Sequence, residues 1–191
     1  MINSIEEVLI GMASDSSQHV REAALAAMDR VRAKRLVDRF RELLKKGTME
    51  ERVHVIHVAV EMADGEGIAL LLEALYDQPE IIRGAAVRAL LPFPTPVVLK
   101  VLWEILPKEK GFVLSNIIEV FGSSGRKELR PHIERYLRHP EAEVRAKAII
   151  AVSRLADGTG LEKILAMRED KDEMIRAAVA EGLGNWTSSQ P

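Results

Sequence analysis

The sequence predicts an all-α fold, an α-α superhelix (α-solenoid) of about six helical-hairpin repeats with a period of 31 residues. The main observation is an arginine that recurs at this spacing, at Arg21, Arg52, Arg83, Arg145 and Arg176, while Leu114 occupies the position that lacks it. The composition agrees, because 47% hydrophobic, 29% charged and only 4% aromatic residues are typical of helices around a narrow core. Each repeat of such a protein is stabilised mainly by its neighbours.

Apolar columns at the same period predict two helices in each repeat, here called helix A and helix B in chain order. One column of helix A is apolar throughout: Ala24, Val55, Ala86, Ile117, Ala148 and Val179. Two columns of helix B lie four residues apart and therefore on one helical face: Phe40, Leu71, Leu102, Ile133 and Ile164, then Leu44, Leu75, Leu106, Leu137 and Arg168. Such columns predict a continuous core between stacked hairpins.

Helix starts and turns carry their usual signals. Thr48 with Glu51, and Thr159 with Glu162, have the spacing of a capping box. Three prolines are expected at the first position of a helix: Pro79, Pro96 and Pro140. Three glycines are expected in turns from helix A to helix B: Gly65, Gly125 and Gly158. The pattern predicts twelve helices, six of each kind.

We expect a single repeat domain over residues 1–186, followed by a polar tail at 187–191. The full repeats are placed near 16–46, 47–77, 78–108, 109–139 and 140–170, with half-repeats at 1–15 and 171–186. The terminal helices should act as caps, and Glu6, Glu7 and Glu181 fit that role only in part. Incomplete caps would permit end-to-end association.

Three segments carry a resemblance to a known family: residues 19–28, 82–90 and 144–152, each with an aliphatic residue before the repeated arginine. With the turns 63–65 and 156–158 (Ala-Asp-Gly), they resemble the HEAT repeat, and more narrowly the short HEAT-like repeats of the phycobilisome (PBS) lyase type. The resemblance implies a right-handed, armadillo-like α-solenoid in which arginine and turn aspartate form polar ladders. The aspartate column departs from this pattern, since it reads Ala33, Asp64, Thr95, Arg126 and Asp157.

The repeated arginines have two interpretations. They could form a row of anion-binding guanidinium groups, or they could bond to turn carbonyls or a neighbouring carboxylate. We favour the structural interpretation, because a residue tied to the repeat register beside the core is usually structural. Two stretches depart from the register: the turn with Pro92, Pro94 and Pro96, and Leu114, which we attribute to drift or repacking.

A candidate binding surface lies on helix B, which lines the concave side in this architecture. We call it the concave strip, and its residues are Arg41, Lys45, Leu72, Tyr76, Trp103 and Arg138. Aromatic side chains flanked by arginine are typical of binding hot spots, and an extended peptide or a partner helix fits such a strip. The alternative is that these side chains pack between neighbouring B helices.

Charge is unevenly distributed, although the net charge is only −2. Residues 30–46 are rich in Arg and Lys, while the last repeat is acidic. A basic run can release counterions from a phosphate backbone, but the near-neutral total favours a solvated helix face over a nucleic-acid site.

Signals for catalysis are weak. His54 and His57 are three residues apart without a third metal ligand at helical spacing, there are no cysteines, and Gly65-Glu66-Gly67 follows no strand as a phosphate loop would. We therefore expect no enzyme activity, no cofactor and no metal. The start of the chain lacks a signal peptide pattern, and no apolar run approaches the ~20 residues that span a bilayer, which predicts a cytoplasmic protein.

The leading functional hypothesis is a non-catalytic protein–protein interaction scaffold that holds an acidic or amphipathic protein or peptide on the concave strip. Two alternatives remain. The family resemblance implies a lyase or chaperone-like subunit for a modified or chromophore-bearing protein. The basic first repeats would suit a nucleic-acid-binding HEAT-like protein.

Overall fold

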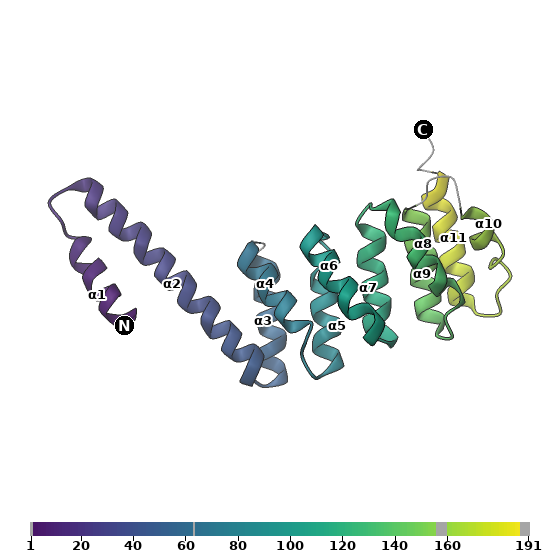
Figure 1. Cartoon of the computed structure of the whole chain (residues 1–191), viewed down its shortest axis with the longest axis horizontal. Helices are drawn as coiled ribbons and strands as arrows, with labels where there is room; N and C mark the ends of the chain where they lie inside the picture. The colour runs from purple at the N-terminus through teal and green to yellow at the C-terminus, as the bar shows by residue number, and fades with distance from the viewer. Residues whose placement is uncertain (1, 63, 156–159, 188–191) are drawn as a thin grey trace. The chain divides into compact units, whose positions relative to one another are not determined.

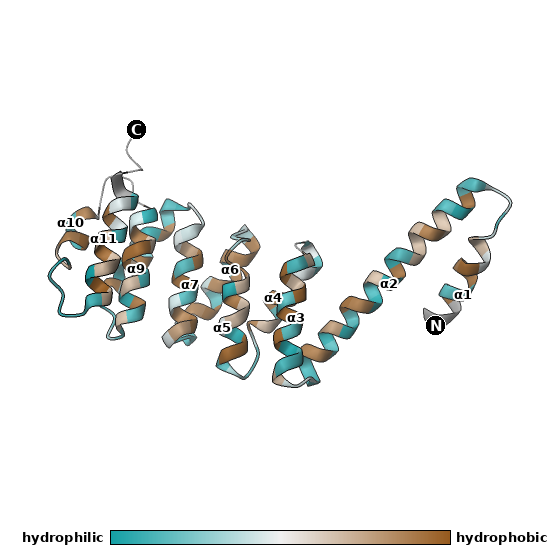
Figure 2. Cartoon of the chain, turned by 180° about the vertical axis from the view of Figure 1, so that it is seen from behind, coloured by the Kyte–Doolittle hydropathy of each residue, from teal (hydrophilic) through white to brown (hydrophobic). Residues whose placement is uncertain are grey.

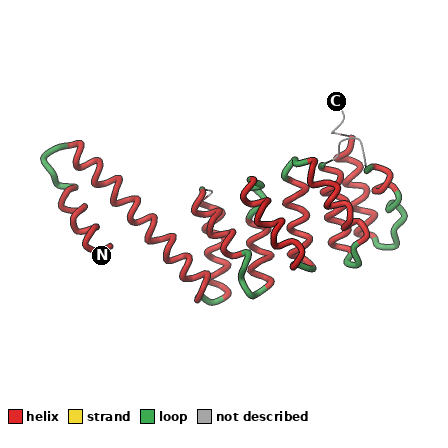
Figure 3. Tube along the Cα trace, in the orientation of Figure 1, coloured by secondary structure: helices red, strands yellow, loops and turns green. Residues whose placement is uncertain are grey.

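The computed structural model describes residues 2–62, 64–155 and 160–187. Every regular element in them is a helix, as the tube in Figure 3 shows, so the all-α solenoid prediction is confirmed. The α-helices are α1 Ile2–Met12, α2 Gln18–Lys46, α3 Met49–Met62, α4 Gly65–Ala74, α5 Glu80–Ala89, α6 Pro96–Ile105, α7 Gly111–Ser123, α8 Arg130–Glu134, α9 Ala142–Arg154, α10 Leu161–Leu165 and α11 Glu173–Thr187. Three 3₁₀ helices accompany them: η1 Leu106–Lys108, η2 Lys127–Leu129 and η3 Arg135–Arg138.

The chain forms two compact units, Met1–Val55 and Ile56–Pro191, and the boundary falls inside α3. In the second unit, the A helices α5, α7, α9 and α11 follow one another in a row, and each packs on the next (Figure 1). The B helices of this unit are α4, α6, α8 and α10. This arrangement is a stack of helical hairpins with contacts mainly between sequence neighbours, which is typical of a repeat protein.

The predicted core columns are buried in both units. All six residues of the helix A column from Ala24 to Val179 are buried. Both helix B columns are buried as well, except that Arg168 is exposed. The hydropathy colouring of Figure 2 shows the resulting alternation of apolar and polar stripes along the helices.

Small residues allow the A helices to approach closely. A Cβ atom added to Gly122 of α7 would lie 2.6 Å from the Cα atom of Ala151 in α9, so only glycine fits at this crossing. Polar bonds join the same helices: Asn116 donates from Nδ2 to the Gly84 carbonyl at 3.2 Å, and Lys147 Nζ donates to Glu119 at 2.7 Å. Successive A helices are therefore held by close packing and by side-chain bonds.

The repeated arginines bond to the turn that precedes their own helix. In Arg21, Arg83, Arg145 and Arg176 one guanidinium nitrogen donates to the carbonyls six and five residues earlier, at 2.7–3.2 Å. Arg52 donates from Nε to the Gly47 carbonyl at 3.0 Å. The structural interpretation of this column is thus confirmed, and Leu114, which replaces the arginine, is only 4% exposed and belongs to the core.

Arg83 makes an additional bond between repeats. Its Nε and second guanidinium nitrogen donate to the two carboxylate oxygens of Glu109 at 2.8 and 3.1 Å. This hydrogen bond is the main reason why the pKa of Arg83 is raised. The turn residues that the family resemblance would place in a ladder act locally instead, because Asp64 and Thr95 accept the amides of Gly67 and Val98 as N-caps.

The other boundary signals had mixed outcomes. Thr48 and Glu51 form the predicted capping box, whereas Gly158 and Thr159 lie outside the described residues. Pro96 is the first residue of α6, as predicted. The prediction was wrong for the other two prolines, since Pro79 is the N-cap of α5 and Pro140 precedes the N-cap of α9.

The predicted hairpin at residues 16–46 is a single helix of 29 residues, α2, so the expected turn near Ala33 and the count of twelve helices were wrong. Residues 31–35 (Val-Arg-Ala-Lys-Arg) contain no glycine or proline to end a helix. Glu22 and Asp29 also occupy columns that hold small residues in the second unit, such as Ser115 and Gly122. Carboxylates at these positions disfavour the regular A-helix packing.

A matched pair of glycine substitutions tests the close packing. Gly122→Ala should lower the free energy of unfolding by about 1–3 kcal/mol, because the methyl group meets the α9 backbone. Gly184→Ala, in α11 with open space around it, should be neutral or stabilising by up to about 1 kcal/mol through helix propensity. Urea denaturation followed by circular dichroism measures both, and equal effects would contradict the packing described.

Candidate functional site

The residues of the predicted concave strip belong to both units. Arg41 and Lys45 lie on α2 in the first unit, while Leu72, Tyr76, Trp103 and Arg138 lie in the second. Arg41 is half-buried and pairs with Asp38 at 3.4 Å, and Lys45 is exposed. The strip as one surface therefore stays a prediction, and the second unit is considered by itself below.

Two aromatic side chains of the strip are exposed in the second unit. Tyr76, just beyond the end of α4, is 64% exposed, and Trp103, on α6, is 37% exposed. Leu72 is half-buried on α4, and Arg138, the last residue of η3, is exposed. These exposures make all four side chains available at least in part, which the sequence columns alone could not establish.

Trp103 also packs against the following repeat. Its ring meets His132 of α8 edge-on at 4.8 Å between centroids, and it lies 5.9 Å from the ring of Phe121. Part of the Trp103 side chain therefore packs between neighbouring helices, as the alternative interpretation of the strip predicted. The indole is held in a fixed orientation with one side against protein and the remainder open.

A pocket of about 290 Å³ lies beside the open part of Trp103. Its lining residues come from α6 and from the turn before α8: Pro96, Leu99, Lys100, Trp103, Arg126, Glu128 and Leu129. The proline-rich turn contributes Pro96, which starts α6 under the Thr95 cap and so fixes one wall of the pocket. Besides its apolar residues the pocket carries the cation of Lys100 and an ion pair between Arg126 and Glu128 at 3.4 Å.

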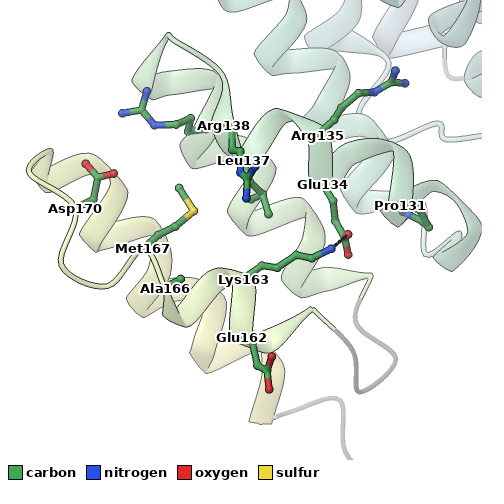
Figure 4. Close-up of a pocket in the computed structure, with 11 residues that line it drawn as sticks. Pro131, Glu134, Arg135, Leu137, Arg138, Glu162, Lys163, Ala166, Met167 and Asp170 are labelled. Atoms are coloured by element: carbon green, nitrogen blue, oxygen red, sulfur yellow. Dashed lines mark hydrogen bonds and ion pairs between the residues drawn. The ribbon is translucent and has the colours of Figure 1, made fainter.

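A larger pocket of about 750 Å³ lies between the B-type segments of the last two repeats (Figure 4). It is lined by Pro131, Glu134, Arg135, Leu137, Arg138, Arg145, Glu162, Lys163, Ala166, Met167 and Asp170. Figure 4 shows Lys163 extending from α10 toward Glu134 of α8, with which it forms an ion pair. Arg130 adds a second cation 3.8 Å from the same carboxylate.

Of the residues predicted for the concave strip, only Arg138 lines this larger pocket. The signal that could have found it is the helix B core column, in which Arg168 replaces the leucines of earlier repeats. A charged residue there indicates that the last helix B does not fill its groove as the others do.

The features considered for catalysis are not assembled into a site. His54 and His57 are both exposed, and a hollow of about 420 Å³ between α3 and α5 includes only His57 of the two. Among the described residues, no group of three or more metal-ligating side chains is present. Within the same residues, the helices are too short or too polar to cross a membrane.

Comparison with protein families gives one match. A model of HEAT repeats matches residues 99–184, a segment that begins in α6 and ends in α11. The matched segment is therefore similar to HEAT repeats, and it contains both pockets except for Pro96. No curated protein matches the sequence.

Substitution of the neighbouring aromatics Trp103 and Phe121 distinguishes a surface residue from a core residue. Phe121 is 1% exposed, so Phe121→Ala should lower the free energy of unfolding by about 3–5 kcal/mol. Trp103→Ala should cost only about 1–2 kcal/mol, because the indole is partly open to solvent. Thermal and urea unfolding measure the difference, and an equal loss in both variants would show that Trp103 is a core residue.

Proposed function

We propose that this chain is a non-catalytic scaffold that binds a protein or peptide on the helix-B side of its second unit. The observation that carries the proposal is the exposure of Trp103 beside an apolar pocket, with Tyr76 exposed one repeat earlier. HEAT repeats are commonly protein-interaction scaffolds, and the repeat match includes Trp103. Exposed aromatics on rigid elements are the residues most often found at the centre of binding sites.

The chemistry of the surface favours an extended or helical partner with apolar and acidic side chains. An apolar side chain would enter the pocket between Trp103, Leu99 and Leu129 and displace water from it. Carboxylates of the partner would meet Lys100 at the same pocket, where Arg126 is already paired with Glu128 at 3.4 Å. Arg138, in the larger pocket, offers a further cation.

The finer assignment to repeats of the PBS lyase type rests on the 31-residue period and the three segments that resemble that family. We include it in the proposal as a description of the repeats and not of an activity. A cytoplasmic location is likewise part of the proposal.

The basic first repeat supports the solvated-face interpretation more than a nucleic-acid site. Three of its cations are engaged by carboxylates: Arg35 by Glu6 at 3.0 Å, Arg41 by Asp38 at 3.4 Å, and Lys46 by Glu42 at 2.8 Å. The third pair lowers the pKa of Glu42 and raises that of Lys46. Such pairing reduces the positive field available to a phosphate backbone.

Selection from a displayed library of random peptides tests the scaffold proposal. Peptides enriched on the wild type should bind the Tyr76→Ala/Trp103→Ala variant about 30-fold more weakly, the loss expected for hot-spot aromatics. The matched control is Ile81→Ala/Met174→Ala, which removes two exposed apolar side chains from A helices. Fluorescence titration gives the affinities.

Enriched peptides that bind both variants and the wild type equally would contradict the proposed site. Failure to enrich any apolar or acidic peptide would contradict the proposed partner chemistry. Trp103 itself provides a second readout, because a bound peptide should change its emission.

A further inference from the structure

The long helix α2 has a stripe of exposed residues at alternating spacings of three and four. The stripe consists of Glu22, Leu25, Asp29, Arg32, Leu36 and Arg39. All six are exposed, and the two leucines are 53% and 48% exposed. This spacing is the one by which a helix presents a single seam to a partner helix in a coiled coil. The stripe thus combines two exposed leucines with four charged residues.

The stripe is complementary to itself when it is read in the opposite direction. Positions whose numbers add to 61 lie opposite each other when two copies of the stripe run antiparallel. These pairs are Leu25 with Leu36, which are both apolar, and Glu22 with Arg39 and Asp29 with Arg32, which are opposite in charge. We propose that α2 pairs with α2 of a second copy of this chain, antiparallel, about a two-fold axis between Arg30 and Val31. Leu25 of one copy then packs on Leu36 of the other, with ion pairs on both sides of each leucine contact.

The charges also select this direction. A parallel pairing in register would place Glu22 opposite Glu22, Asp29 opposite Asp29 and each arginine opposite its own equivalent. Like charges at a helix seam are unfavourable, while the antiparallel arrangement makes every charged contact attractive. An interface of this symmetry uses the same patch on both copies and closes as a dimer.

Neighbouring residues allow the two helices to approach. Ala26 and Ala33 flank the stripe and are exposed, and in the antiparallel register they lie opposite Arg35 and Met28. The other side of α2 is used within the chain, where α1 packs on α2 and Glu6 pairs with Arg35 at 3.0 Å. Arg35 is not a member of the stripe, so this hairpin contact leaves the stripe open.

The repeat register supports the same assignment of the face. Glu22, Leu25 and Asp29 lie three periods of 31 residues before Ser115, Ile118 and Gly122 of α7. In α7 this face contacts the next A helix, through Ser115 with Glu143 and Gly122 with Ala151. In α7 this face binds a neighbouring helix. In α2 the same face carries charges that are complementary to those of an antiparallel copy of the stripe.

Sedimentation equilibrium of the full chain at several concentrations tests the proposal. The wild type should dimerise, and the affinity should fall as salt is raised, because exposed ion pairs are screened. Two charge variants are compared with it: Glu22→Arg/Asp29→Arg, which makes the charged stripe positions all basic, and Arg32→Asp/Arg39→Glu, which makes them all acidic. Each of these two variants, on its own, should self-associate at least about 10-fold more weakly than the wild type.

Mixing the two variants should restore association as a one-to-one heterodimer. A chain that carries all four substitutions should recover the homodimer, since every antiparallel pair is again opposite in charge. The control is Arg30→Asp/Lys34→Glu, which makes a similar charge change at exposed positions outside the stripe on the same helix. Circular dichroism confirms that α2 remains helical in each variant.

Three results would overturn the proposal: a wild type that is monomeric at all concentrations, a mixture that does not associate, or a control that weakens association as much as the stripe variants. The outcome is independent of peptide binding at Trp103. A failed dimer test leaves that proposal standing, and the reverse also holds.

Discussion

The bond between each repeated arginine and the turn before its helix is the constraint on which the rest of the structure depends. In four of the five arginines one guanidinium nitrogen reaches two consecutive carbonyls of the preceding turn, and Arg52 reaches the Gly47 carbonyl through Nε. This fixes where each A helix starts relative to the helix B before it. With the starts fixed, the apolar columns keep the same register from repeat to repeat, and helices such as α7 and α9 can approach until Gly122 meets the Ala151 backbone.

Departures from the repeat locate the surfaces that remain for partners. Trp103 and the proline-rich turn before α6 line a pocket, whereas the turn before α4 is a short Asp64-Gly65 turn. In the first unit, carboxylates replace small residues on the stacking face, and α2 continues as one helix. Both surfaces arise because a residue at a stacking or turn position no longer serves the regular packing. The peptide surface and the α2 stripe are therefore two consequences of one repeat pattern.

Sequence reasoning predicted the fold and the core but only part of the candidate site. The core columns follow from helical periodicity alone, so even Leu114 could be placed beside them. The continuous helix α2 was missed, because a register argument assumes that every repeat turns at the same position. The contact of Trp103 with His132, and the pocket around Met167, join residues of different repeats. Their geometry depends on how side chains of neighbouring helices fill space, which a column of residue types does not specify.

The most direct test of the arginine constraint is the stability of Arg83→Met compared with Arg88→Met, both on α5. Methionine keeps the apolar stem but removes the donors to the Asp77 and Gln78 carbonyls and to Glu109. Urea unfolding should show a loss of about 1.5–3 kcal/mol for Arg83→Met, the range for hydrogen bonds to charged groups. Arg88 is exposed, and its variant should stay within about 0.5 kcal/mol of the wild type. Equal stabilities in the two variants would contradict the claim that the repeated arginine holds the register.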